Sequence, residues 1–302
     1  PDANAFNARV ERLFIENDDL TGQAEVSEMI PNDFYGQLLD SPGIEVIVVD
    51  NWAKPMLGTN KLYAPTSSPK TMRALIAMTD PAEYMTAGYG SSDLWTLGPC
   101  LLFCSGPWAS QVGAEAYYEV DPVKAQQLWD EGVAESGYNI DSDKMILLTN
   151  TDYADFYAAS LITKRVLEDL GAEVDFVVTD WATVISRKIG NLHKDPQTES
   201  GWHFYHSWDE GGYDPFASVT FSDAWNGGWD HARGQQLRLD FVKAKTTEEA
   251  KTIVDELHDI FWNESPSIVH YGSFGGLFVQ QDYVNGWVGH KQPNAIGVWL
   301  DQ

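Results

Sequence analysis

Residues 144–190 decide the fold class, and they read KMILLTNTDYADFYAASLITKRVLEDLGAEVDFVVTDWATVISRKIG. Apolar and β-branched runs here and just beyond predict three strands, at 144–149, 173–179 and 202–208. Two segments with helical features separate them, at 152–170 and 180–189. Strands that alternate with helices of this length are typical of βαβ units, so the sequence predicts an α/β fold built on a sheet.

Further elements flank this stretch on both sides. Additional strands are expected at 44–50, 267–271 and 296–300. Helix starts are marked by the pairs Ser68-Pro69, Asp80-Pro81 and Asp121-Pro122, because a capping side chain followed by Pro suits the first helical turn. The last of these helices should end near Ser136, before Gly137. Residues 246–263 carry an apolar face with helical period, and Thr246 with Glu249 forms a capping box at its start.

Composition excludes several classes of protein. The chain has 302 residues, with 19 Lys and Arg against 45 Asp and Glu, so its formal net charge is −26. Such a field repels nucleic acid and anionic membrane surfaces, so neither is expected as a partner. A hydrophobic fraction of 43% is ample for a packed core, and no apolar run approaches the length of a transmembrane helix.

Motifs for catalysis or cofactors are scarce. The sequence has no Gly-x-Ser-x-Gly elbow, no Gly-x-Gly-x-x-Gly and no Gly-x-x-x-x-Gly-Lys, so neither acyl transfer nor a nucleotide cofactor is indicated. His203 and His206 fall on opposite faces of a strand, which argues against a metal pair. No cofactor and no metal are therefore expected. Asp209-Glu210 or Asp180 could form the acid/base pair of a glycoside hydrolase, which is the enzymatic alternative.

The two cysteines leave two readings open. Cys100 and Cys104 are the only Cys in the chain. They form a small-loop disulfide if the compartment is oxidising, or remain two buried thiols that pack as small hydrophobic groups. Because Pro1 is not Met, the chain is expected either to have lost a signal segment or to be an internal piece.

Aromatic residues gather in and after the predicted strand at 202–208. Within 28 residues, interleaved with glycine pairs, lie Trp202, Phe204, Tyr205, Trp208, Tyr213, Phe216, Trp225 and Trp229. Part of this set belongs in a core. Rigid amphipathic rings after a strand end also line binding clefts, which favours a binding surface here.

Several segments resemble family 5 extracellular solute-binding proteins, the dipeptide- and oligopeptide-binding components of ABC importers. The matching segments, in order, are Asp2 to Val10, Gly22 to Pro31, Ser41 to Val46, Ser68 to Asp80, Tyr118 to Leu128, Glu135 to Tyr138, Leu170 to Val174, Tyr213 to Pro215 and Asn263 to Val269. Their order and spacing cover essentially the whole chain. Since the family is longer, the chain corresponds to its C-terminal three fifths.

The resemblance implies a fold and a division into lobes. It implies a type II periplasmic-binding-protein-like α/β fold, with one complete lobe and part of the other. Residues 1–66 and 265–302 would belong to lobe I and residues 67–264 to lobe II. Pro-rich breaks near 59–69 and 263–266 agree with this division. In the family the ligand is buried between lobes that close by hinge motion.

The resemblance also implies ligand-binding residues. The family's strand tryptophan falls on Trp208, with Asp209 and Glu210 as acidic neighbours. The arginine that clamps a peptide carboxylate in the family falls near Tyr157. Trp95 and Trp181 are weaker candidates around this site, and no residue is expected to be catalytic.

The predicted function is therefore ligand capture and delivery. A monomeric binding protein, periplasmic or extracellular, would bind a peptide-like or other small solute and present it to membrane permeases. The ligand should be neutral or cationic, because an ionised carboxylate buried without a guanidinium is costly. Besides the glycoside hydrolase, a pure interaction module is the third possibility.

Overall fold

The computed structural model describes residues 27, 29–115, 117, 119–210, 212–223, 228–264, 266–285 and 299–300. The chain divides into two compact units. Unit 1 comprises residues 1–52, 89–96 and 274–302, and unit 2 comprises residues 53–88 and 97–273. Within the described residues, no helix is long and apolar enough to cross a membrane.

Unit 2 is built on the expected sheet. Three of its strands are parallel to one another: β3 (Met145–Asn150), β4 (Val174–Thr179) and β5 (Phe204–Asp209). The end of β1 (Ile44–Thr59) runs antiparallel to β5, with Lys54 opposite Asp209, and β6 (Ile268–His270) also pairs with β1. The order of the strands in this unit is β1-β5-β3-β4. The predicted α/β fold is thus confirmed.

Two connecting helices cover opposite faces of this sheet. Val184 of α7 (Trp181–Gly190) packs with Ile146 and Leu148 of β3, whose side chains share one face. On the other face, Thr163 of α6 (Ala154–Asp169) lies 2.9 Å from Nε2 of His206 on β5. Both helices occupy the segments that the sequence predicts.

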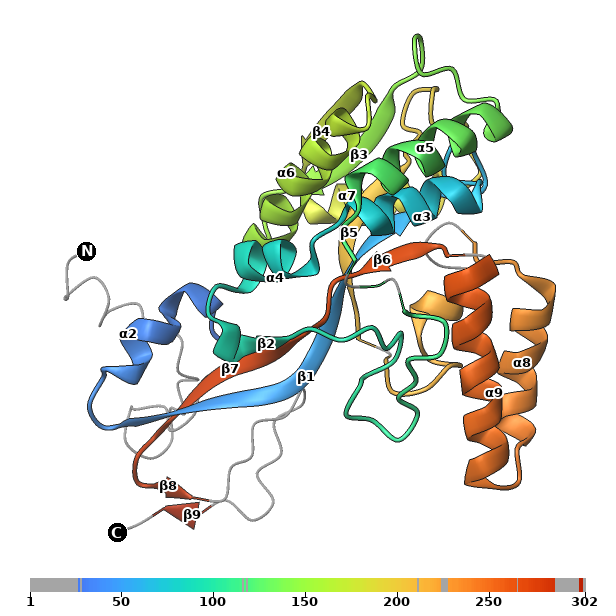
Figure 1. Ribbon diagram of the computed structural model, residues 1–302. Helices are drawn as coiled ribbons and strands as arrows, with labels where there is room; N and C mark the ends of the chain where they lie inside the picture. Colours follow the sequence, from blue (N-terminus) through green and yellow to red (C-terminus); the bar gives the residue numbers. More distant parts are fainter. Residues whose placement is uncertain are drawn as a thin grey trace. The chain divides into compact units, whose positions relative to one another are not determined.

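A helix pair formed by α3 (Pro69–Met78) and α5 (Pro122–Ser136) lies side by side in Figure 1. Both helices begin with the capping residues that the sequence predicts. Ser68 Oγ accepts from the Lys70 N–H at 3.2 Å, and Asp121 Oδ1 accepts from the Lys124 N–H at 2.9 Å. Gly137 ends α5 in the left-handed region, with φ +74°. The short helix α4 (Pro81–Tyr89) also begins at its predicted Pro.

A second helix pair, α8 (Ala232–Lys243) and α9 (Thr247–Asp259), contributes to a hydrophobic core of unit 2 (Figure 1). Thr246 Oγ1 accepts from the Glu249 N–H, as the capping box predicts. A π-helical turn, Ile260–Glu264, continues α9, and the short 3₁₀ helix η3 (Val219–Phe221) packs near α8. The sequence of α8 is mostly polar and does not indicate a helix, so the sequence analysis did not predict this element.

Unit 1 contains the first part of β1, β7 (Ser273–Gln281) and β2 (Trp95–Thr96), in the order β2-β7-β1. The short helices η1 (Asn32–Phe34), α2 (Tyr35–Leu39) and η2 (Ser92–Leu94) complete it, with the ribbon of β8 (Val284–Asn285) and β9 (Trp299–Leu300). Its core includes Ile30, Leu38, Leu94, Leu277 and Val279. Of the expected strand at 296–300, residues 296–298 lie outside the described residues.

The boundaries of the units differ from the lobe boundaries that the sequence suggests. The sequence places divisions after residues 66 and 264, whereas the compact units divide after residues 52 and 273. The reason is that β1 extends to Thr59, well beyond the predicted 44–50, so the Pro-rich stretch that follows lies wholly in unit 2. Residues 89–96 also belong to unit 1.

Candidate functional site

The carboxyl ends of β3, β4 and β5 share one edge of the parallel sheet, the usual place for ligand sites in α/β folds. The chain leaves β3 through residues 151–153 into α6 and leaves β4 through Asp180 into α7. At the end of β5 stand Trp208 and Asp209. Side chains from three separate segments therefore converge at this edge.

Four aromatic rings meet there, and we call them the ring cluster: Tyr153, Phe156, Trp181 and Trp208. The Phe156 ring lies 4.8 Å from the Trp208 ring and 5.1 Å from the Trp181 ring, measured between centroids. Tyr153 lies 5.3 Å from Trp208 and meets it edge-on. Phe156 is buried, while the other three rings are half-buried. The cluster thus combines a packed base with ring surface that a ligand can reach.

Two carboxylates from the start of α6 orient the tryptophans. Asp155 Oδ2 accepts from the Trp208 indole Nε1–H at 2.8 Å. Asp152 Oδ2 accepts from the Trp181 backbone N–H at 2.6 Å. Because these carboxylates stand beside half-buried rings, the site offers apolar faces and negative charge together, a combination that suits cations and hydrogen-bond donors.

The start of α7 and its buried lysine fix the position of Trp181. Asp180 caps α7, and hydrogen bonds from the Thr183 hydroxyl and N–H hold the pKa of the Asp180 carboxyl below its usual value. Lys188 Nζ lies 4.2 Å from the centroid of the Tyr205 ring and 5.7 Å from that of Trp181. Burial lowers the pKa of Lys188 to about 8.

Asp209, expected beside Trp208 as a ligand group, instead faces the interior of unit 2. Its side chain is fully buried, and Oδ2 accepts from Ser218 Oγ at 2.6 Å and from Thr220 Oγ1 at 3.1 Å. Its strand neighbour Lys54 is buried as well, and burial lowers the pKa of Lys54 to about 8 against the opposing effect of Asp209. Alternation along β5 explains the placement, since Asp209 and Trp208 point to opposite faces.

The other residues that were expected to bind ligand lie in three different places. Glu210 is exposed at the end of β5. Tyr157 lies on α6, half-buried, and contacts Phe176 of β4 at 6.1 Å between centroids. Trp95 belongs to unit 1, where its Nε1 donates to the Gly90 carbonyl. The structure therefore brings Trp208 and Trp181 together.

Sequence analysis missed Tyr153, Phe156 and the two carboxylates of α6. Their signal was present, because Asp152, Tyr153, Asp155 and Phe156 directly follow the predicted strand at 144–149. Carboxyl ends of parallel strands meet at one edge, so this turn should approach the end of the strand that carries Trp208.

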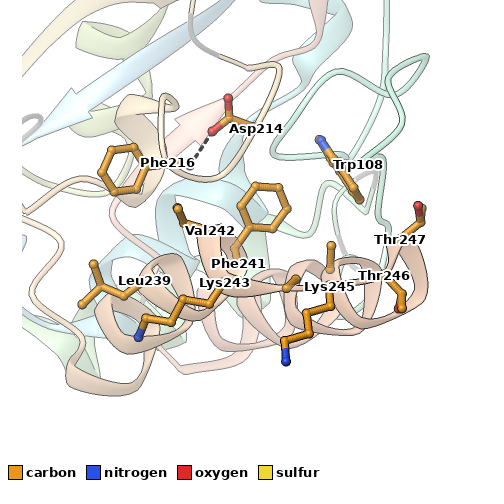
Figure 2. A pocket seen from close by; sticks show the side chains of 12 residues that line it. Trp108, Asp214, Phe216, Leu239, Phe241, Val242, Lys243, Lys245, Thr246 and Thr247 are labelled. Carbon is orange, nitrogen blue, oxygen red and sulfur yellow. Dashed lines mark hydrogen bonds between the residues drawn. The ribbon is translucent and has the colours of Figure 1, made fainter.

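A pocket of about 920 Å³ lies elsewhere in unit 2 and shares none of these residues. Figure 2 shows Phe241 at its centre, between Trp108 and the turn that holds Phe216. Asp214 Oδ1 accepts from the Phe216 N–H at 2.8 Å, which fixes that turn. The rest of the lining comes from the end of α8, the start of α9 and the residues between them.

Other features bear on chemistry. Cys100 and Cys104 form a disulfide, with Cα atoms 5.4 Å apart, so the first of the two readings is the one observed. Across the described part of the chain, no group of three or more His, Cys, Asp or Glu side chains is arranged to hold a metal ion.

Comparisons with known proteins support the expected fold. No family model matches the chain. It is 24% identical over 259 residues to a probable peptide ABC transporter periplasmic-binding protein of Sinorhizobium fredii, covering 82% of this chain and 46% of that protein. The chain thus spans about half the length of this relative.

Two solved structures resemble the whole chain. A putative peptide-binding protein AppA from Clostridium difficile has a TM-score of 0.76 and 14% identity, covering 100% of this chain and 60% of its own. The oligopeptide-binding protein AppA from Bacillus subtilis, solved with a nonapeptide, has a TM-score of 0.74 and 13% identity, covering 100% and 59%. The resemblance to peptide-binding components of ABC importers is confirmed in the fold, as is the expected partial coverage. The motifs at 2–10 and 22–26 lie outside the described residues.

Proposed function

We propose that this chain is the ligand-binding part of a periplasmic or extracellular substrate-binding protein of an ABC importer. The observation that carries the proposal is the ring cluster, which lies with Asp152 and Asp155 at the carboxyl edge of the sheet. It stands in a fold shared with solved peptide-binding proteins. Its function is to capture a solute and deliver it to permease subunits, with no catalytic step.

The proposed ligand is a peptide or a similar small organic molecule that is neutral or cationic at the end bound here. Half-buried rings contact flat or apolar groups over a large area with little loss of side-chain entropy. Asp152 and Asp155 favour ammonium groups and N–H donors over anions. Tyr157 occupies the position at which the family resemblance places a carboxylate-binding arginine, which argues against tight binding of a free carboxylate at this place.

A glycoside hydrolase is the enzymatic alternative, and no observation favours it. The expected pair cannot act together, because Asp209 is fully buried and hydrogen-bonded to Ser218 and Thr220, while Glu210 is exposed. Asp155 is engaged by the Trp208 indole. The three similar proteins reported above are all named as binding proteins.

Isothermal titration of the full-length protein tests the proposal. We expect the amide of the tripeptide lysyl-alanyl-alanine to bind more tightly than its free acid, because the amide lacks a terminal negative charge. The Trp208→Ala variant should bind at least tenfold more weakly, whereas Phe216→Ala, an exposed ring outside the ring cluster, should bind like the natural protein. Equal binding by both variants, or tighter binding of a dianionic peptide, would contradict the proposal.

A further inference from the structure

A short loop closed by a disulfide lies against the chain that leaves β5. Cys100 and Cys104 are joined, and the three apolar residues between them, 101–103, are all buried. Residues 97–104 form neither helix nor strand. The disulfide is therefore a covalent constraint on a segment without regular secondary structure. We call residues 100–104 the disulfide loop.

Phe103 connects the disulfide loop to the end of β5. Its backbone N–H donates to the Gly212 carbonyl at 2.8 Å. Its ring meets the Tyr213 ring edge-on, with the centroids 4.8 Å apart. A Cβ at Gly212 would lie 3.3 Å from Phe103 Cε2, so the ring lies directly against this backbone. Gly212 follows Trp208 by four residues, and the disulfide loop therefore holds the segment that comes after the strand of the ring cluster.

The same backbone also packs against a side chain of β1. A Cβ at Gly212 would lie 3.2 Å from Cδ of Lys54. Lys54 is buried and stands opposite Asp209 in the register of β1 and β5. The chain after β5 is therefore held by two contacts, one from β1 and one from the disulfide loop.

The strand end held in this way belongs to the candidate site. Trp208 contributes its half-buried ring to the ring cluster, and Glu210 is exposed beside it. Groups that must be ordered during binding reduce the affinity, because their loss of conformational freedom costs free energy. A loop that fixes the residues after Trp208 before the solute arrives therefore favours binding.

The two ends of the disulfide differ in exposure. Cys104 is an exposed residue, whereas Cys100 is 1% exposed. A thiolate from solvent therefore reaches the Cys104 end, and access of this kind governs the rate of thiol–disulfide exchange. Because these are the only Cys in the chain, an external thiol is needed to open the bond.

We propose that the Cys100–Cys104 disulfide positions the end of β5 for solute binding, so that its reduction by a dithiol weakens solute capture; this rests on the proposed function. One thiolate of the dithiol attacks Cys104 Sγ, the sulfur–sulfur bond breaks, and Cys100 leaves as a thiolate that takes up a proton. The second thiol of the reductant then displaces Cys104 as a thiol and closes a cyclic disulfide. Two electrons and two protons pass to the protein, and Phe103 loses the constraint that holds it against Gly212.

Titration of the full-length protein with lysyl-alanyl-alanine amide, before and after reduction with dithiothreitol, tests the proposal. Alkylation followed by mass spectrometry of the peptide that contains residues 100–104 shows that reduction is complete. We expect at least fivefold weaker binding after reduction. In protein labelled with 5-fluorotryptophan, the fluorine resonance of Trp208 should shift on reduction even without solute. Phe103→Leu keeps the disulfide but removes the ring beside Tyr213, and it should bind at least fivefold more weakly without reductant.

Val254→Ala is the control for stability. Val254 lies on α9 in the core that also contains Leu101 and Leu102, so this variant lowers the unfolding temperature and leaves the contact between Phe103 and Gly212 in place. Its affinity should stay within twofold of the natural protein.

Unchanged affinity after complete reduction overturns the proposal. An equal loss of affinity in Val254→Ala and Phe103→Leu overturns it too, because lowered stability alone would then account for the effect. Absence of amide binding in the oxidised protein contradicts the proposed function instead. The Trp208 resonance then decides the positioning role by itself, and a resonance that stays in place on reduction overturns that role.

Discussion

Asp209 and Glu210 are neighbours in the sequence, yet they stand in opposite environments. Asp209 is fully buried beside Lys54 and accepts hydrogen bonds from two hydroxyl groups, Ser218 and Thr220. Glu210 is exposed. Thr220 Oγ1 also lies 2.9 Å from Nε2 of the buried His270, so the Asp209 carboxylate belongs to a polar network inside unit 2. Asp209, the acidic neighbour of Trp208, is therefore a structural residue.

This placement predicts a large difference between two matched variants. Asp209→Asn removes the carboxylate and leaves the Lys54 ammonium buried without its counter-charge. Breaking one side of such a pair costs roughly 3–5 kcal/mol of unfolding free energy. Glu210→Gln should change stability by less than about 0.5 kcal/mol. Urea denaturation of the two variants measures both values, and similar stabilities would show that Asp209 has no such role.

The contact between α3 and α5 is set by a glycine. A Cβ at Gly132 of α5 would lie 2.4 Å from Thr71 Oγ1 and 2.7 Å from the Thr71 nitrogen on α3. The second atom is backbone, so the helices would have to separate to admit a methyl group.

Gly132→Ala should therefore destabilise the protein by roughly 1–3 kcal/mol, despite the higher helix propensity of Ala. Gly190→Ala is the control, because Gly190 is also helical and has no atom within 4 Å of its added Cβ. That variant should be neutral or more stable by up to about 1 kcal/mol. Thermal unfolding of both would settle the point, and a stabilised Gly132→Ala would rule out close helix contact.

Buried histidines join the strands and helices of unit 2. His203 Nδ1 accepts from the Ile146 N–H at 2.9 Å, which requires a neutral ring. Burial lowers the pKa of His203 to about 4 and that of His206 to about 3. His258 and His270 are buried as well, with pKa values also lowered by burial.

Stability should fall as the pH drops below 6.5. The unfolded chain binds protons on these histidines near their ordinary pKa of about 6.5, and the folded chain does so only at much lower pH. Each histidine then contributes roughly 1 kcal/mol of lost unfolding free energy between pH 6.5 and 5.5. Denaturation curves at both pH values test this, with His206→Gln showing a smaller loss. Equal stability at both values would contradict burial of neutral rings.

The elements differ in how well the sequence reveals them. Helices with a capping residue and a Pro at the start, such as α3 and α5, were predicted because these signals are local. The strand β7 was missed because Gly275 and Gly276 weaken its pattern. Both glycines are required by close packing, since a Cβ at Gly275 would lie 2.6 Å from Val48 Cγ1. Because Gly275 and Val48 are far apart in the sequence, local patterns do not reveal this contact.

The candidate site shows the same limit. Trp208 was expected from the family resemblance and Trp181 as a weaker candidate around it, and the structure brings their rings to one edge of the sheet. The buried position of Asp209 was not foreseen, because its pairing with β1 and its hydroxyl partners come from distant segments. Tyr153 and Phe156 were missed, although the predicted strand order brings their turn to the same edge. Local sequence patterns indicate the carboxyl edge of the sheet as the place of the site. Tertiary packing, which local patterns do not show, decides which side chains face solvent at that edge.

At the scale of the whole molecule, the chain covers 60% of the length of the peptide-binding protein from Clostridium difficile, and it carries a net charge of −26. Strong negative charge favours cationic and neutral solutes over anions at every approach to the site. The proposed delivery to a membrane complex requires a ligand-dependent change in conformation or dynamics, so the proposed binding surface should respond to ligand.

The most direct test of the proposed binding surface is fluorine NMR of the full-length protein labelled with 5-fluorotryptophan, with each resonance assigned by Trp→Phe variants. On saturation with the lysyl-alanyl-alanine amide, the resonances of Trp208 and Trp181 should shift. Those of the buried Trp129 and Trp229, which lie outside the ring cluster, should stay in place. Unchanged Trp208 and Trp181 resonances in a protein shown by titration to be saturated would place the ligand elsewhere and contradict the account.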